Sequence, residues 1–173
     1  ICIIQNGNIV QFGQPEEILK HPQNDYVEKF VGKNRIWGNP KYIHASDIMC
    51  RECLQLSKDR TVIQALQVMR ENAVNSVLVT SGSNGVLEGV VWLEDIQKLD
   101  DAQMGLRLHQ IISQNYKYVY EETTLQEVID TIDYNRSGVI SVLNHRGELK
   151  GILTKSRLLS VLSRRYRQRK EEE

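Results

Sequence analysis

An internal repeat constrains the fold of this 173-residue chain more than any other feature of its sequence. Residues 46–99 and 109–161 show the same order of hydrophobic patterns. In each copy a threonine, Thr61 or Thr124, precedes a stretch whose apolar residues recur at i, i+3, i+4 and i+7, the pattern of an amphipathic helix. The threonines are 63 positions apart (124 − 61 = 63) and stand where an N-cap is expected, and Glu127 adds a capping-box pattern in the second copy. We therefore predict two equivalent helices.

Short apolar stretches typical of β-strands follow each predicted helix, at residues 76–79 and 87–91 in the first copy and 139–142 and 149–153 in the second. A polar turn containing glycine separates the members of each pair, as in a hairpin. A strand before each helix, such as residues 117–120, and a closing apolar-periodic stretch complete the unit. The predicted fold class is therefore α/β, with the order strand, helix, strand, strand, helix repeated once. Because a unit of about 55 residues is marginal alone, we expect the two sheets to pack against each other.

Composition and charge exclude several classes of protein. Hydrophobic residues make up 40% of the chain, which is enough for a folded core, and 22 basic residues balance 22 acidic ones. This balance argues against a nucleic-acid-binding domain, and no apolar run approaches the ~20 residues of a membrane span. The three cysteines form no disulfide framework, so we expect a reduced, cytosolic protein. The sequence predicts no catalytic constellation, and the lone C-x-x-C of Cys50 and Cys53 predicts no metal site.

The order of elements and the closing segment of each copy resemble the CBS domain family. In that family a Gly-apolar-apolar-Thr/Ser-x-x-Asp segment closes a nucleotide cleft, where the hydroxyl contacts phosphate and the carboxylate holds the ribose. The first copy keeps the carboxylate, Asp95, but has Trp92 where the hydroxyl belongs, whereas the second keeps the hydroxyl, Thr154, but has Arg157 in place of the carboxylate. The resemblance implies tandem CBS domains packed with pseudo-twofold symmetry. The departures predict that neither copy holds ribose in the usual way and that Trp92 fills the first cleft.

The first 32 residues carry a second resemblance. A predicted hairpin turns at Asn6-Gly7 and leads to a helix that begins at Pro15, with acidic residues in its first turn. This stretch resembles the end of the ATPase domain of ABC transporters from the quaternary-amine uptake group. An ATPase tail followed by tandem CBS domains is the layout of importers for glycine betaine, carnitine, choline or proline.

This layout implies a parent subunit that works as a transport ATPase beside transmembrane permease subunits, in the cytoplasm at the inner face of the cell membrane. The phosphate-binding loop and the acidic strand of such an ATPase are absent from these residues, so the chain is expected to be a regulatory fragment and not an enzyme. We expect it to begin inside a longer protein. The expected segments are an ATPase tail at 1–32, a linker at 33–43 that contains Trp37, CBS repeats at 44–103 and 104–164, and a charged tail at 165–173.

CBS modules in importers of this layout are similar to those that bind cyclic di-AMP and switch uptake off. A cyclic dinucleotide needs flat surfaces for two adenines and donors for two phosphates. Tyr118 and Tyr120 alternate along a predicted strand and point to one face, whereas their equivalents in the first copy, Gln55 and Ser57, cannot stack on a base. The predicted ligand residues, which add arginines, hydroxyls, backbone amides and apolar contacts for adenine, are Tyr118, Tyr120, Arg136, Ser137, Gly138, Val139, Ile140, Thr154 and Arg157.

A twofold-symmetric ligand suits an isologous interface, to which each chain contributes the same residues. The sequence hypothesis is therefore a homodimer that holds one cyclic di-AMP between its two second repeats and thereby inhibits solute import. No other cofactor is predicted. The alternative is a module without a nucleotide, which dimerises or senses ionic strength through the basic residues 164–170 near its C-terminal end.

Overall fold

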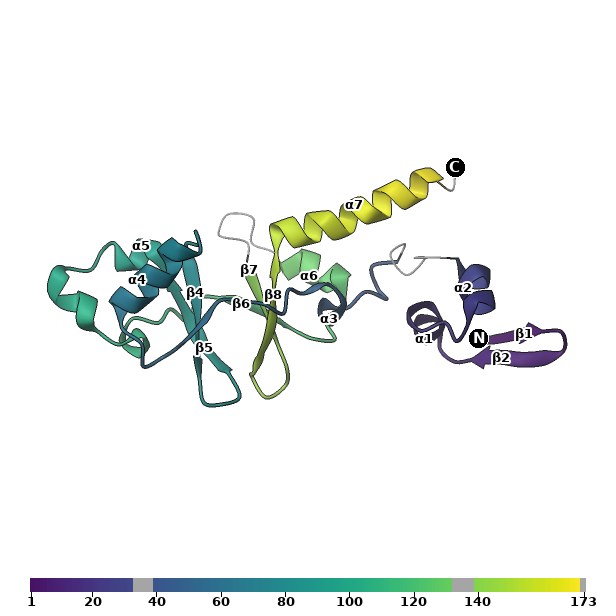
Figure 1. The fold of residues 1–173 in the computed structure, drawn as a ribbon, viewed down its shortest axis with the longest axis horizontal. Helices are drawn as coiled ribbons and strands as arrows, with labels where there is room; N and C mark the ends of the chain where they lie inside the picture. Colours follow the sequence, from purple (N-terminus) through teal and green to yellow (C-terminus); the bar gives the residue numbers. More distant parts are fainter. Residues whose placement is uncertain (33–38, 132–138, 172–173) are drawn as a thin grey trace.

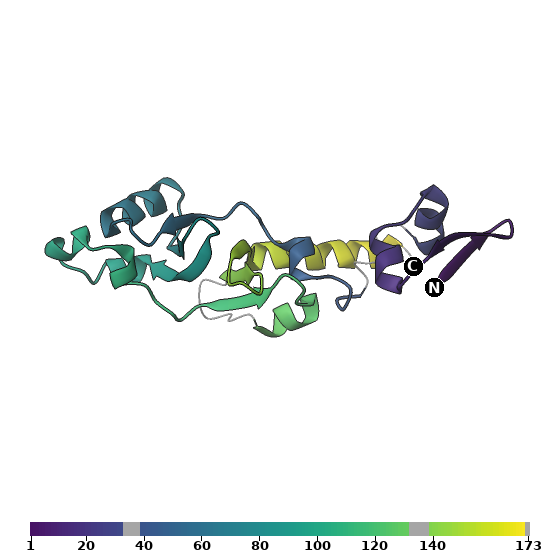
Figure 2. The same ribbon diagram turned by 90° about the horizontal axis from the view of Figure 1, so that it is seen from below.

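The computed structural model describes residues 1–32, 39–131 and 139–171, with the side chains of the last helix described as far as residue 163. A hairpin-helix unit lies at one end of an elongated molecule, the second repeat in the middle and the first repeat at the other end (Figures 1 and 2). Trp37 in the predicted linker lies outside the described residues. No helix within the described ranges has both the length and the hydropathy of a membrane span.

The hairpin-helix unit consists of β1 (Cys2–Gln5), β2 (Asn8–Phe12), α1 (Pro15–Lys20) and α2 (Asp25–Val31). Asn6 and Gly7 form the predicted turn, with φ of 51° and 79°, as the right-handed twist of a two-residue hairpin requires. Pro15 stands in the first turn of α1, as its fixed φ and missing N–H favour. A small core of its own, centred on Ile3, Ile18 and Val27, holds this unit together.

Each repeat has the predicted order of elements. The first contains β3 (Gln55–Ser57), α4 (Val62–Glu71), β4 (Ser76–Ser81), β5 (Val86–Trp92) and α5 (Leu93–Ile96), preceded by α3 (Ala45–Ile48). The second contains β6 (Lys117–Tyr120), α6 (Leu125–Thr131), β7 (Val139–Leu143), β8 (Leu149–Thr154) and α7 (Lys155–Glu171), preceded by the 3₁₀ helices η2 (Asp101–Gly105) and η3 (Leu108–Gln110). The sheets β3-β4-β5 and β6-β7-β8 share one topology, in which the first pair is parallel and the second antiparallel.

Reciprocal capping begins both central helices. In the second repeat the Glu127 carboxylate accepts from the backbone N–H of Thr124 at 2.9 Å, and the Thr124 hydroxyl accepts from the N–H of Glu127, as predicted. In the first repeat Gln64 takes the place of the glutamate and accepts from the N–H of Thr61 at 3.1 Å. Each helix therefore starts at a position fixed by two side-chain oxygen atoms.

The segments that lead into the two repeats are exchanged in space. The second-repeat core, built on residues such as Val119, Leu125 and Leu153, also contains Ala45 and Ile48 of α3, both fully buried. The first-repeat core, built on α4, β4 and β5, in turn contains Leu108 of η3. Each core is thus completed by the entry segment of the other repeat, so the two repeats cannot be separated without opening both cores.

The same contacts occur twice, as pseudo-twofold symmetry requires. The isolated bridge between His44 and Thr124 is matched by the bridge between Arg107 and Thr61, with partners 63 positions apart in both cases (107 − 44 = 63 and 124 − 61 = 63). Together with the shared topology of the two sheets, this confirms the predicted α/β fold of two equivalent repeats packed with pseudo-twofold symmetry.

This exchange explains why glycine stands at the start of the Gly-apolar-apolar segment in each repeat, at Gly89 and Gly151. A Cβ at Gly151 would lie 2.6 Å from the carbonyl oxygen of Cys50, and a Cβ at Gly89 would lie 2.7 Å from that of Ser113. Both carbonyls belong to the entry segment of the other repeat, which runs antiparallel to the strand at this point. Only glycine lets the two backbones approach so closely.

The inner faces of the sheets meet in a third cluster, formed by Leu78, Leu87, Val90 and Leu143 with Trp92, Tyr116 and Ile152 packed around it. The turn residue Gly85 accepts a hydrogen bond from the N–H of Leu149, and Leu87 donates to Gly147 in return, so the two hairpins are also joined at their tips. This confirms that the sheets bury their faces against each other, as the marginal size of a single unit predicts.

Candidate functional site

A cavity of ≈ 710 Å³ lies between the two repeats. Its walls come from the segment before β3, the end of α4, the start of β4 and the end of β5 in the first repeat, and from the start of β6 with the residues before it, the start of β7 and the end of β8 in the second. The lining residues are Glu52, Cys53, Leu54, Asn72, Val74, Asn75, Ser76, Leu78, Val90, Trp92, Asn115, Tyr116, Lys117, Val139, Ile140, Ser141, Ile152 and Thr154. A lining that combines apolar side chains with polar ones suits a flat, partly polar ligand such as a nucleobase.

Trp92 does not close the first-repeat side of this cavity. The indole is half-buried in the cluster between the sheets and lines the cavity beside Leu54 and Asn75 of the same repeat. The expectation that Trp92 fills the first cleft is therefore wrong, because first-repeat residues around the indole still line open space. Asp95, the carboxylate that the motif keeps, does not line the cavity and pairs with Lys98 at 2.7 Å.

A row of aromatic side chains leads from the cavity onto the open edge of the second sheet. Tyr116 lines the cavity, and Tyr118 and Tyr120 follow it on the same face of β6, whose other face buries Val119. Ring centroids are 6.2 Å apart for Tyr116 and Tyr118 and 5.8 Å for Tyr118 and Tyr120. The side chain of His145 stacks on Tyr120 at 4.6 Å. These four rings are here called the aromatic row.

Two tyrosines of the aromatic row are exposed, and the strand that carries them, β6, lies at the edge of its sheet. Tyr118 is 47% exposed and Tyr120 is 37% exposed, and in the register with β7 they pair with Ser141 and Leu143. The corresponding residues on β3, Gln55 and Ser57, are also exposed but have no ring. The predicted placement of both tyrosines on one face is confirmed by the alternating burial along β6.

Arg157 is tied to the exchanged entry segment. Its Nε donates to the carbonyl oxygen of Ile48, the last residue of α3, at 2.8 Å, and its backbone N–H donates to the Thr154 hydroxyl at 3.2 Å. The guanidinium therefore links the start of α7 to the end of α3. This bond uses Nε, and a guanidinium carries further N–H donors on Nη1 and Nη2 that can bind an anion.

The structure brings some of the predicted ligand residues together and separates others. Val139, Ile140 and Thr154 line the cavity. Tyr118 and Tyr120 lie next to it on the aromatic row, and Arg157 lies at the junction with α3. Arg136, Ser137 and Gly138 lie outside the described residues.

Sequence reasoning missed Tyr116, Lys117 and His145. Tyr116 could have been found, because the alternation of Tyr118 and Tyr120 extends back to it at i−2. Burial, and then the neighbouring Tyr118 and Glu88, raise the pKa of Tyr116, so its hydroxyl stays protonated at neutral pH. His145 lies in the β7–β8 turn, and no local pattern places its ring on Tyr120.

The cysteine pair shows no activated thiol. Cys50 is exposed, whereas burial raises the pKa of the half-buried Cys53, which favours the neutral thiol over the reactive thiolate. Within the described residues, no three His, Cys, Asp or Glu side chains are grouped so that they could hold a metal ion.

The CBS domain model matches residues 45–100 and 108–164, so the chain belongs to the CBS domain family and carries two such domains in tandem. Among proteins of known role it is similar to the carnitine transport ATP-binding protein OpuCA of Listeria monocytogenes, with 33% identity over 164 residues that cover 94% of this chain and 40% of that protein. It is also 33% identical to the glycine betaine transport ATP-binding protein OpuAA of Bacillus subtilis, over 94% of this chain and 37% of that protein. The predicted resemblance to osmoprotectant-importer ATP-binding subunits is thereby confirmed, and the chain spans about 40% of the length of such relatives.

Solved structures show the same fold. Staphylococcus aureus OpuCA aligns with a TM-score of 0.58 at 22% identity, over 67% of this chain and 96% of that one. CbpB, solved in complex with c-di-AMP, aligns with a TM-score of 0.67 at 14% identity, over 75% of this chain and 91% of that one.

Proposed function

We propose that this chain is the regulatory module of an osmoprotectant importer's ATP-binding subunit. In this proposal two chains bind one cyclic di-AMP between their second repeats, and the bound messenger inhibits solute import. The parent subunit would then work at the inner face of the membrane with permease partners. The observation that carries the proposal is the aromatic row, which continues from the cavity onto an uncovered sheet edge.

The aromatic row supplies what an adenine needs. Exposed tyrosine rings offer stacking surfaces, and stacking of a base on an aromatic side chain contributes about 1–3 kcal/mol. The adjacent start of β7 at Val139 and Ile140 offers apolar contact and backbone groups for the polar edge of the base. Because cyclic di-AMP has a twofold axis, two copies of this surface facing each other would meet its two adenines with the same residues.

Donors for the phosphates lie around the same surface. The Thr154 hydroxyl lines the cavity and Lys117 follows Tyr116 at its rim. Arg157 offers its remaining N–H groups from the start of α7, where an anion is also favoured by the backbone. Arg136, Ser137 and Gly138 remain proposed ligand residues on the strength of the sequence alone.

The test is calorimetric titration of the purified chain with cyclic di-AMP, with AMP, ATP and cyclic di-GMP in parallel. We expect saturation near one ligand per two chains and selectivity for cyclic di-AMP. The double variant Tyr118→Ala/Tyr120→Ala should weaken binding by about tenfold or more, because at least one stacked base loses its platform. The matched control is Gln55→Ala/Ser57→Ala, at the equivalent positions of the first repeat, which should bind as tightly as the wild type.

Two results would refute this assignment. Equal weakening by both double variants would show that the tyrosines act only through stability. No heat with any of the four nucleotides, from a folded sample, would favour the nucleotide-free alternative of dimerisation or ionic-strength sensing. Salt-dependent binding to anionic vesicles that is lost on removal of residues 164–173 would then support the ionic-strength function.

A further inference from the structure

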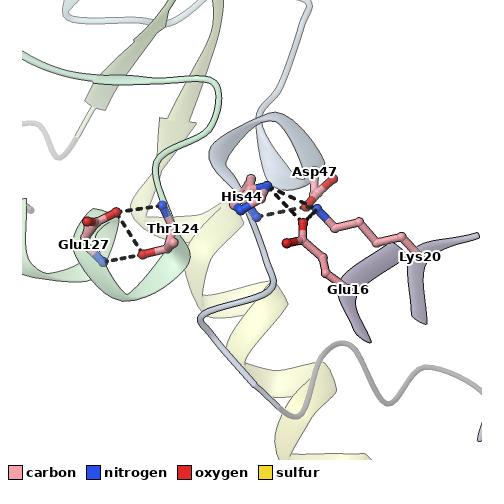
Figure 3. A network of polar contacts seen from close by, with 6 residues as sticks. All are labelled: Glu16, Lys20, His44, Asp47, Thr124 and Glu127. Carbon is pink, nitrogen blue, oxygen red and sulfur yellow. Dashed lines mark hydrogen bonds and ion pairs between the residues drawn. The ribbon is translucent and has the colours of Figure 1, made fainter. Parts of the chain in front are cut away.

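Helix α1 of the hairpin-helix unit meets the start of helix α3 of the CBS pair through two residues, Glu16 and Lys20 (Figure 3). The Lys20 ammonium lies 2.9 Å from Glu16 Oε1 on its own helix, 2.8 Å from Asp47 Oδ2 and 3.2 Å from His44 Nδ1. Glu16 in turn lies 3.4 Å from His44 Nδ1. Within residues 1–32 and 39–131, every hydrogen bond and ion pair between the unit and the CBS pair involves Lys20 or Glu16. These four residues are here called the Lys20 latch.

The latch is ordered but weak. The Lys20 side chain is 17% exposed, less than the lysine of any other described ion pair, and its hydrogen-bonding capacity matches three acceptors. Burial opposes its charge, but the hydrogen bonds to Asp47 and Glu16 outweigh that cost and raise the pKa of Lys20. The apolar core of the hairpin-helix unit shares no described residue with the second-repeat core, and the described ion pairs between the two parts are those of the latch. Such a contact can open and close at low cost.

The far side of the latch is fixed to the second repeat. Asp47 Oδ2 also accepts from the backbone N–H of His44, so both latch residues on this side belong to the first turn of α3. Helix α3 buries Ala45 and Ile48 in the second-repeat core. The N–H groups of Ala45 and Ser46 donate to carbonyl oxygens in the turn directly after β6, the strand of the aromatic row.

The opposite end of α3 is held by the elements that carry the phosphate donors. The carbonyl oxygen of Ile48 accepts from Arg157 Nε at 2.8 Å. Cys50, two residues on, exchanges two backbone hydrogen bonds with Ile152 of β8. Helix α3 and the residues directly after it thus bond to the turn after β6, to β8 and to α7, and these elements adjoin or carry Tyr120, Thr154 and Arg157 of the proposed ligand residues.

We propose that α3 and the Lys20 latch form a relay through which the ligand state of the second repeat sets the position of the hairpin-helix unit. The identity of the ligand in this relay rests on the proposed function. The contacts that join Arg157, α3 and the hairpin-helix unit do not depend on it. A phosphate bound at the outer N–H groups of Arg157 leaves the Nε bond to Ile48 intact and orders the guanidinium. Ligand binding therefore tightens α3 against the second repeat and favours the closed latch.

The experiment measures the distance between spin labels on Cys2 of β1 and on Leu159→Cys of α7, in a Cys50→Ser/Cys53→Ser background. Leu159 is 66% exposed, and Cys2 is also exposed, so both accept a label. Labelled chains are diluted in unlabelled ones, so that distances arise within one chain. The salt concentration is set where half of the wild-type population is open, since ion pairs at the surface weaken with salt.

Lys20→Gln should lower the closed-to-open ratio by about five- to tenfold, as expected for the loss of the ion pair to Asp47 and the polar contact with His44, and Lys20→Arg should restore most of it. Lys29→Gln is the matched control, a lysine of the same unit with the same charge change, and should leave the ratio unchanged. Arg157→Met, without ligand, should lower the ratio in the same direction as Lys20→Gln. Cyclic di-AMP at saturation should raise it in the wild type but not in Lys20→Gln.

The outcomes separate this relay from the proposed function. Unchanged distances in Lys20→Gln would show that no latch exists. A response to Lys20→Gln but not to Arg157→Met would show a latch that the second repeat does not control. If calorimetry shows cyclic di-AMP binding and the ratio stays constant or falls, the relay is refuted while the binding function stands. If no nucleotide binds, the binding function fails, and the Arg157→Met result alone decides the relay.

Discussion

The exchange of entry segments predicts that a substitution in one repeat will unfold the other. Ile48 belongs to the first repeat in sequence but is fully buried in the second-repeat core, and Leu108, from the entry segment of the second repeat, is likewise fully buried in the first-repeat core. Ile48→Ala removes three carbon atoms from a site that cannot collapse, because the backbone of α3 is hydrogen bonded at both ends. Within the range of about 2–5 kcal/mol for such truncations, we expect a loss of roughly 3 kcal/mol.

The assay is native-state hydrogen exchange read by mass spectrometry on peptides from each sheet. A loss of ~3 kcal/mol raises the population of the open state about 100-fold. In Ile48→Ala this increase should appear in the β7–β8 peptides, and in Leu108→Ala it should appear in the β4–β5 peptides. Faster exchange confined to β4–β5 in Ile48→Ala would mean that α3 packs on its own repeat and would refute the exchanged arrangement.

Two further predictions follow from close contacts at the repeat boundary. Gly151→Ala should destabilise the fold by about 1–3 kcal/mol in chemical unfolding, because its Cβ would lie 2.6 Å from the Cys50 carbonyl oxygen. Gly105→Ala is the control and should not destabilise the fold, because the space around Gly105 is open. Equal effects of the two substitutions would exclude close packing as the reason for Gly151. Hydrogen bonds from Lys150 and Asn144 lower the pKa of Glu148 below its ordinary value of 4.5. The ionised carboxylate therefore stabilises the fold above pH 4.5, and this stabilisation is lost as the pH falls through the lowered pKa of the folded state. Glu148→Gln should therefore flatten the pH dependence of the unfolding midpoint below pH 4.5. The same pH dependence in the variant and the wild type below pH 4.5 would contradict this.

Local signals in the sequence account for most of the elements. The capping threonines Thr61 and Thr124 set the helix starts, and the glycine-containing turns set both hairpins. Alternation along residues 117–120 predicts the exposed tyrosine face, because a strand reverses its side chains at every residue. Each of these signals acts within a few residues of its effect, which is why it can be seen in a single sequence.

The features that sequence reasoning missed depend on contacts between distant residues. Arg157 and Ile48 are 109 positions apart, and nothing near either residue specifies the other. The apolar residues of α3 would fit either core, since the two cores are built on the same pattern, so periodicity cannot tell on which repeat α3 packs. The open cavity beside Trp92 was missed for the same reason, because the room left beside a ring depends on how the two sheets pack.

The exchanged arrangement gives the two repeats unequal roles despite their common pattern. The chain leaves the hairpin-helix unit and its first regular element after the linker, α3, enters the second repeat, so the nearest folded neighbour of the unit is the repeat that bears the aromatic row. The first repeat, where Gln55 and Ser57 replace the tyrosines, lies at the far end of the molecule (Figure 1). A ligand on the second repeat can therefore act on the hairpin-helix unit through one short helix. A ligand on the first would have to act through the whole sheet interface. The absence of aromatic side chains at the two equivalent positions of the first repeat, Gln55 and Ser57, is what is expected if only the nearer repeat is used for control.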